Sequence, residues 1–255
     1  MKGFGNNNQS KKKKIYPLNY KNEDYQILNQ AIRYQSEGNI VQAIKCYEFL
    51  IRKEFQESVV FANYGIILIN LGRLQEAEVS IRKAIELNPR DATLYSNLGG
   101  ILKDLGEIKQ AEVSIRKAIE LNPKDALLHT NLGGILKDLG EIKQAEVSIR
   151  KAIELNPKYA NAYLNLGIIL SDLGNLHEAA ISTRKAIELN PDYAIAHLNL
   201  GNILKDLGEI KQAEVSIRKA IELNPDYAIA HLNLGNILKD LGEIKQAEVS
   251  IRKAI

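Results

Sequence analysis

The sequence predicts an all-α protein, a solenoid of antiparallel helix pairs, and three observations predict it. A proline recurs every 34 residues, at Pro89, Pro123, Pro157, Pro191 and Pro225. A glycine keeps the same interval, at Gly38, Gly72, Gly106, Gly140, Gly174, Gly208 and Gly242. Each of these units contains two apolar patterns of helical length. A fixed period of this length with two helices per unit is typical of a helical repeat array.

The unit at residues 92–125 shows how its first helix is predicted. Apolar and small residues between Ala92 and Leu105 recur at steps of three and four, which is the spacing of one helical face. Asp91 precedes them as the expected N-cap. Gly106 follows them, where a helix commonly needs a residue in the left-handed conformation.

The second helix of the same unit is expected from about Glu107 to about Leu121. Pro123 stops it, because proline has no N–H and disfavours a helical residue before it. Gly99 lies inside the first helix, where glycine costs about 1 kcal/mol relative to alanine. We expect a close approach of the second helix at Ala111 to compensate for that cost.

The charge of the chain is unevenly distributed. Residues 1–23 hold six lysines and one acidic residue, so the net charge of +3 leaves −2 for the rest of the chain. The nearly neutral array is not expected to bind nucleic acid, which needs a basic surface. The segment 1–23 is polar and of low complexity, which predicts a disordered arm. Its block Lys11–Lys14 is interpreted as a solvated stretch, with contact to nucleic acid or anionic lipid as the alternative.

Other signals concern the compartment. No run of about 18 apolar residues is present, so no membrane span is expected. No apolar region follows the lysines as in a signal peptide. The single cysteine, Cys46, excludes an intrachain disulfide and fits a reducing compartment, so a cytoplasmic location is predicted. We expect Cys46 to be a small buried hydrophobe.

One series of residues resembles a known repeat. It consists of Tyr95, Leu98, Gly99, Leu102, Gly106, Ala111, Ile115, Ala118 and Pro123. This series resembles the tetratricopeptide repeat (TPR), which implies a right-handed superhelical solenoid. The match covers 24–57, 58–91, 92–125, 126–159, 160–193, 194–227 and a truncated unit at 228–255. The first unit departs most, with Gln30-Ala31 for Leu-Gly and Phe55 for proline, as expected of a terminal cap.

Nothing in the sequence predicts catalysis. Residues 192–221 and 226–255 are identical, whereas an active site needs unlike residues that converge. No nucleophile, phosphate-loop or metal-binding motif occurs. His129, His197 and His231 occupy the position that Phe61, Tyr95 and Tyr163 hold in sister units, which favours packing over metal binding. No enzyme activity, cofactor or metal is therefore expected.

One polar position does recur in the first helices. We call its six members the asparagine ladder: Asn63, Asn97, Asn131, Asn165, Asn199 and Asn233. The same helical stripe continues three and seven residues on, with Asn202, Asn236, Asp104, Asp138, Asp206 and Asp240. Asparagine is a poor helix former, so its repetition indicates a role. Its amide can pair with the C=O and the N–H of a peptide.

The ladder is similar to the asparagine ladder of O-linked N-acetylglucosamine transferases. The resemblance implies that Asn63 through Asn233 bind the backbone of an extended peptide. The alternative is that these amides bond between neighbouring units and stabilise the stack. Lysines at 103, 137, 205 and 239, each followed by an aspartate, would add a rim of mixed charge.

Three functions follow from this interpretation. The leading one is a non-enzymatic scaffold that binds an extended segment of another protein. The second is a substrate-presenting arm of a larger glycosyltransferase, sulfotransferase or methyltransferase, because similar arrays continue into such domains. The third is end-to-end self-association through apolar ends of the array.

Overall fold

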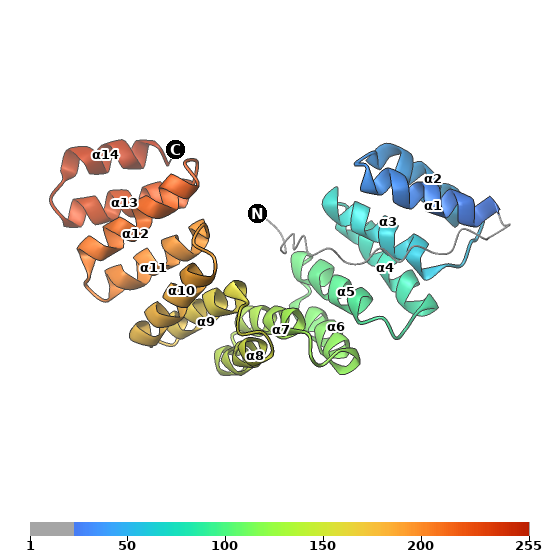
Figure 1. Ribbon diagram of the computed structural model, residues 1–255, viewed down its shortest axis with the longest axis horizontal. Coiled ribbons are helices and arrows are strands. Elements are labelled where there is room, and N and C mark those ends of the chain that lie inside the picture. The colour runs from blue at the N-terminus through green and yellow to red at the C-terminus, as the bar shows by residue number, and fades with distance from the viewer. Residues whose placement is uncertain (1–22, 255) are drawn as a thin grey trace. The chain divides into compact units, whose positions relative to one another are not determined.

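The computed structural model describes residues 23–254, which form fourteen α-helices and no strand (Figure 1). The predicted all-α stack of helix pairs is confirmed. The helices belong to two compact units that divide between Pro123 and Lys124, and each unit is described by itself. The arm predicted for residues 1–23 lies, apart from Glu23, outside the described residues.

The first unit consists of three helix pairs. Its helices are α1 (Glu23–Ser36), α2 (Ile40–Arg52), α3 (Ser58–Asn70), α4 (Leu74–Leu87), α5 (Ala92–Asp104) and α6 (Ile108–Leu121). The two helices of each pair pack on each other, and α2 packs on α3 as α4 does on α5. Every pair therefore buries its apolar face partly within itself and partly against its neighbour.

The second unit repeats this arrangement. Its helices are α7 (Ala126–Asp138), α8 (Ile142–Leu155), α9 (Ala160–Asp172), α10 (Leu176–Leu189), α11 (Ala194–Asp206), α12 (Ile210–Leu223), α13 (Ala228–Asp240) and α14 (Ile244–Arg252). The first helices of successive pairs, α7, α9, α11 and α13, also contact one another in that order. They form one layer, and the second helices form the other.

The helix ends follow the predicted capping residues. The Oδ1 atom of Asp91 accepts a hydrogen bond of 2.9 Å from the N–H of Thr93, which confirms the N-cap. Gly106 has φ +82° and donates to the carbonyl of Lys103 at 3.0 Å. Helix α5 ends one residue earlier than expected, because Leu105 is its C-cap. The left-handed glycine thus turns the chain directly into α6.

Close packing at Gly99 is confirmed, although its main partner differs from the expected one. A Cβ atom at Gly99 would lie 2.7 Å from both Cγ1 and Cδ1 of Ile115, and 3.3 Å from the carbonyl oxygen of Ala111. Ile115 and Ala111 are both buried. The missing side chain of Gly99 therefore makes room chiefly for an isoleucine, and only secondarily for the backbone at Ala111.

The core of the first unit contains the only cysteine of the sequence. Cys46 is half-buried and packs beside a cluster that includes Tyr47, Leu50 and Leu28. Burial raises the pKa of its thiol. Its role as a small apolar side chain agrees with the prediction, although the burial is incomplete.

None of the helices between residues 23 and 254 is both long and apolar enough to cross a lipid bilayer.

Candidate functional site

The asparagine ladder places one side chain on each first helix from α3 to α13. Asn63 and Asn97 lie in the first unit, and the other four members lie in the second. All six side chains are half-buried. The ladder positions are thus neither core residues nor fully solvated ones.

Asn63 is occupied by a contact with the preceding helix pair. Its Nδ2 donates to the hydroxyl of Tyr47 at 3.1 Å, and this hydroxyl donates to Oε1 of Gln35 at 2.9 Å. Tyr47 is fully buried, and burial raises its pKa to about 12. At this position the amide helps to hold α3 against α2, as the stacking alternative expects.

Asn233 makes a second contact of this kind. Its Nδ2 donates to Oδ1 of Asn202 at 2.8 Å, which joins α13 to α11. Asn202 belongs to the stripe three residues beyond the ladder. The structure therefore brings two of the predicted site residues together on neighbouring first helices. Asn236, at the corresponding place on α13, is exposed.

Four ladder members differ from these two. Across residues 23–254, the amides of Asn97, Asn131, Asn165 and Asn199 have no side-chain hydrogen bond. Three of them, Asn131, Asn165 and Asn199, lie on the consecutive first helices α7, α9 and α11 of the second unit. Half-buried amides without protein partners have both donors and acceptors to offer a ligand.

The predicted rim of lysines and aspartates forms ion pairs between successive first helices. Lys205 Nζ lies 3.7 Å from Oδ2 of Asp240, and Lys137 Nζ lies 3.6 Å from Oδ2 of Asp172. These exposed pairs each contribute little to stability. The remaining predicted aspartates, Asp104, Asp138 and Asp206, are also exposed.

Sequence reasoning missed two residues of this layer. Asp172 was not singled out, although it follows Asn165 by the same seven residues as the other aspartates follow their asparagines. Asn161 accepts a hydrogen bond of 2.9 Å from the hydroxyl of Tyr193, which joins two successive pairs. No repeated pattern pointed to Asn161, because neighbouring units hold apolar residues there.

Two of the histidines show the predicted packing role. Nε2 of His197 lies 2.9 Å from the carbonyl oxygen of Pro191, and Nε2 of His231 lies 2.8 Å from that of Pro225. Because a carbonyl only accepts, each Nε2 carries the proton. Each hydrogen bond links the first turn of the helix that carries the histidine to the loop that precedes this helix. In the described part of the chain, no three His, Cys, Asp or Glu side chains are grouped so as to hold a metal ion.

The second helices carry ion pairs between side chains four residues apart. Arg116 lies 2.7 Å from Glu112 on α6, and Arg150 lies 2.8 Å from Glu146 on α8. Arg150 also reaches Glu178 on α10, at 2.5 Å. That second contact, between neighbouring units, was not predicted. Pairs of this kind stabilise an exposed helix by about 0.2–0.5 kcal/mol each.

Comparison with known families identifies the repeat. Tetratricopeptide repeat models match residues 60–91, 92–125, 126–159 and 149–180, and a model described as TPR repeat matches 169–208 and 201–242. These matches concern the repeat itself and not any one transferase. No curated protein sequence matches the chain.

Solved structures agree with this assignment. A tetratricopeptide repeat protein from Parabacteroides merdae matches with a TM-score of 0.77 and 22% identity, over 91% of each chain. PilW, a type IV pilus biogenesis factor, matches with a TM-score of 0.71 and 21% identity, over 76% of this chain and 90% of its own. YrrB matches with a TM-score of 0.55 and 26% identity, over 72% of this chain and 95% of its own. The chain therefore belongs to the tetratricopeptide repeat family.

Proposed function

We propose that this protein is a non-enzymatic scaffold that binds an extended segment of another protein through the asparagine ladder. The observation that carries the proposal is the position, burial and hydrogen bonding of the side-chain amides of Asn131, Asn165 and Asn199. These amides recur on three neighbouring first helices of one unit, they are half-buried, and none has a side-chain partner in the described residues. Membership in the tetratricopeptide repeat family supports a role in protein interaction, and so does the likeness to solved structures such as that of PilW.

The spacing of the ladder suits a peptide backbone. Packed helices lie about 8–10 Å apart, and an extended chain advances about 3.3 Å per residue. Successive amides would then meet about every third residue of a bound segment. Each amide can donate to a peptide carbonyl and accept from a peptide N–H, so recognition depends little on the ligand's side chains.

A solved neighbour offers independent support. YrrB is described as a TPR protein with an unusual peptide-binding site. Its identity of 26% with this chain is low, so the likeness supports a peptide as the class of ligand and no particular sequence.

The test removes the amides without changing the apolar core. Asn131, Asn165 and Asn199 are replaced together by alanine, and binding of a peptide selected from a random library is measured by fluorescence anisotropy. We expect binding to be lost while helicity, measured by circular dichroism, is kept. Loss of helicity in this variant would instead show that the amides stabilise the packing between neighbouring repeats.

A matched control removes the same chemical group elsewhere. Gln110, Gln144 and Gln212 are exposed carboxamides on the second helices α6, α8 and α12. Their joint replacement by alanine should leave the affinity unchanged. Equal loss in both triple variants would contradict a specific role for the ladder.

The alternative function is a substrate-presenting arm of a larger transferase. The same amides would then hold the segment that the catalytic domain modifies. The mass of the native protein, measured by immunoblotting with an antibody against the array, separates the two functions. A polypeptide much larger than 28.5 kDa with transferase activity would favour the arm.

A further inference from the structure

The rim of lysines and aspartates is interrupted at one place in the second unit. Lys205 on α11 reaches Asp240 on α13, which is 35 residues further along the chain. The rim pair between α7 and α9 has the same separation. By this step Asp206 would pair with residue 171, which is a serine. Asp206 therefore lacks the lysine that the equivalent aspartates have.

The carboxylate of Asp206 is exposed and unpaired. Within residues 23–254 it has neither an ion pair nor a side-chain hydrogen bond. Asp206 is also the last residue of α11, where backbone carbonyls without an intrahelical partner carry a partial negative charge. A carboxylate at this end of a helix adds to that charge, so the place left open by Ser171 favours a cation.

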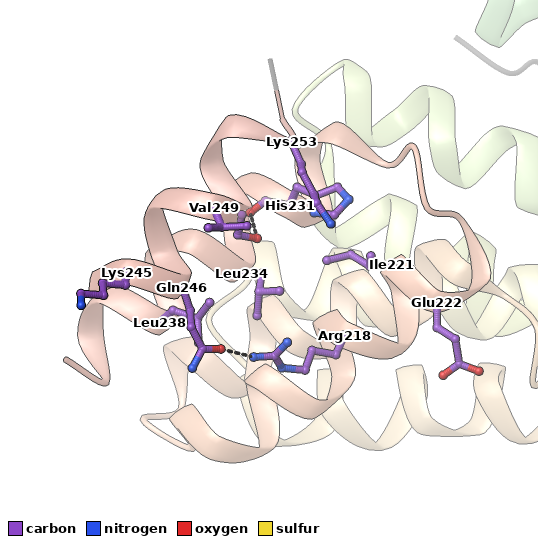
Figure 2. Close-up of a pocket in the computed structure, with 11 residues that line it drawn as sticks. Arg218, Ile221, Glu222, His231, Leu234, Leu238, Lys245, Gln246, Val249 and Lys253 are labelled. Carbon is purple, nitrogen blue, oxygen red and sulfur yellow. Dashed lines mark hydrogen bonds between the residues drawn. The ribbon is translucent and has the colours of Figure 1, made fainter. Parts of the chain in front are cut away.

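The cations of α12, the second helix of the same pair, do not neutralise Asp206. Arg218 and Lys219 both pair with glutamates of α12 at 2.7 Å. Figure 2 shows that Arg218 is also directed at Gln246, to which its Nη2 donates at 3.5 Å beside a cavity of about 530 Å³. Lys211, the remaining cation of α12, is exposed and has no ion pair in the described part of the chain.

Asp206 lies on the same helical stripe as the ladder member Asn199. Seven residues separate the two, which is close to two turns and about 10 Å along the axis of α11. The flexible four-carbon stem of a lysine extends about 6 Å, and a charged hydrogen bond closes about 3 Å more. A basic side chain on a peptide that is bonded to Asn199 would therefore reach Asp206.

We propose that the peptide bound along the asparagine ladder carries a lysine or arginine where it crosses α11, and that this side chain pairs with Asp206. The inference rests on the proposed function, because the ladder positions the peptide. The ligand's cation takes the place beside Asp206 that Lys205 holds beside Asp240. The amides of the ladder hold the backbone of the segment, and Asp206 selects for its charge.

The first test compares three peptides that differ in one side chain. The probe is Ser-Ala-Ser-Ala-Xaa-Ala-Ser-Ala-Ser, amidated at its C-terminus and labelled with an uncharged fluorophore, in which Xaa is lysine, glutamine or glutamate. Because the ladder contacts the backbone, such a peptide can shift its register until Xaa lies next to Asp206. At low ionic strength the lysine peptide should bind the full chain about threefold more tightly than the glutamine peptide, and the glutamate peptide more weakly. The difference should shrink as salt is added.

The outcomes of this comparison separate the inference from the proposed function. Equal affinities of the three peptides would overturn the inference and leave backbone binding by the ladder in place. Absence of binding by all three would contradict the proposed function itself, and the inference with it.

Two variants test the role of Asp206. Asp206→Asn removes the carboxylate, whereas Ser171→Lys supplies the missing lysine of the rim at a position where Lys137 and Lys205 fit in sister repeats. Each variant should bring the lysine and glutamine peptides to within about 1.5-fold of each other, without changing the affinity for the glutamine peptide. A preference for lysine that persists in either variant would overturn the proposal.

A matched control makes the same change in net charge on the other layer. Glu222 is exposed on α12, where it lines the cavity of Figure 2 and pairs with Lys219. Glu222→Gln should keep the threefold preference for the lysine peptide, because Asp206 and Ser171 are unchanged. Equal loss of the preference in this control and in Asp206→Asn would show that only the net charge matters.

The chain contains another source of cations, the block Lys11–Lys14. Replacement of these four lysines by serine should leave the affinity for the lysine peptide unchanged if the occupant is a partner protein. A gain of more than about threefold would show that the chain's own lysines compete for the site, and it would contradict a partner as the occupant.

Discussion

Asn233 donates from Nδ2 to Oδ1 of Asn202 at 2.8 Å and so joins two successive first helices of the second unit. The bond uses one donor of Asn233 and one acceptor position of Asn202. The remaining oxygen of Asn233 and the NH₂ group of Asn202 stay available. The two interpretations of the ladder are therefore compatible, because a paired amide can stabilise the stack and still offer groups to a ligand.

Removal of this bond should have a measurable effect on stability. We expect Asn233→Ala to lower the free energy of unfolding by about 1 kcal/mol, because Asn202 loses its donor. Asn199→Ala, at the equivalent position without a partner, should be neutral or slightly stabilising, since alanine is the better helix former. Urea denaturation followed by circular dichroism measures both variants. Equal losses would contradict the different roles assigned to the two positions.

Neighbouring glycines of α5 allow a matched test of helix packing. Gly99→Ala should destabilise the protein by about 1–3 kcal/mol, because its Cβ would lie 2.7 Å from two atoms of Ile115. Gly100→Ala should instead stabilise it by up to about 1 kcal/mol, since a Cβ there meets nothing within 4 Å. Thermal unfolding of the two variants decides the point. A destabilised Gly100→Ala would contradict the packing account.

Stability at high pH should depend on Tyr47. The unfolded chain releases the phenol proton at a pKa near 10, whereas the folded chain holds it to about 12. Between these values the unfolded state binds fewer protons, so the free energy of unfolding falls as the pH rises. This single group accounts for a loss of about 3 kcal/mol over that range.

The variant Tyr47→Phe serves as the control for this effect. It should be less stable than the parent at neutral pH, because Asn63 and Gln35 lose their partner. Its stability should nevertheless fall by about 3 kcal/mol less between pH 10 and pH 12. Identical pH profiles of parent and variant, measured by urea denaturation, would show that Tyr47 does not titrate in this way.

The sequence predicted the helices well because each is marked by residues with strong local preferences. Gly106 and Pro123 limit α6, which begins one residue after the expected Glu107 and ends at Leu121. Such signals act within a few residues and need no knowledge of the partner helix. The placement of the asparagines on one helical face follows from the same 34-residue period.

The contacts between repeats were harder to predict. Asn233 meets Asn202, which is 31 residues away, and Lys205 meets Asp240 at a separation of 35. Neither separation equals the period, because it depends on how far one helix is shifted along the next. The choice between Ile115 and Ala111 at Gly99 depends on a rotamer in the same way. A period gives the residues of a layer, whereas their pairing needs the packed structure.

The central claim is that the ladder binds peptide backbone, and N-methylation of a bound peptide tests it most directly. Methyl groups on alternate backbone nitrogens remove the N–H donors without changing the side chains. We expect this change to weaken binding by more than about tenfold, and a reordering of the side chains by less than about threefold, since each lost hydrogen bond costs about 1 kcal/mol. Full affinity of the methylated peptide, together with loss of binding on reordering, would contradict the account.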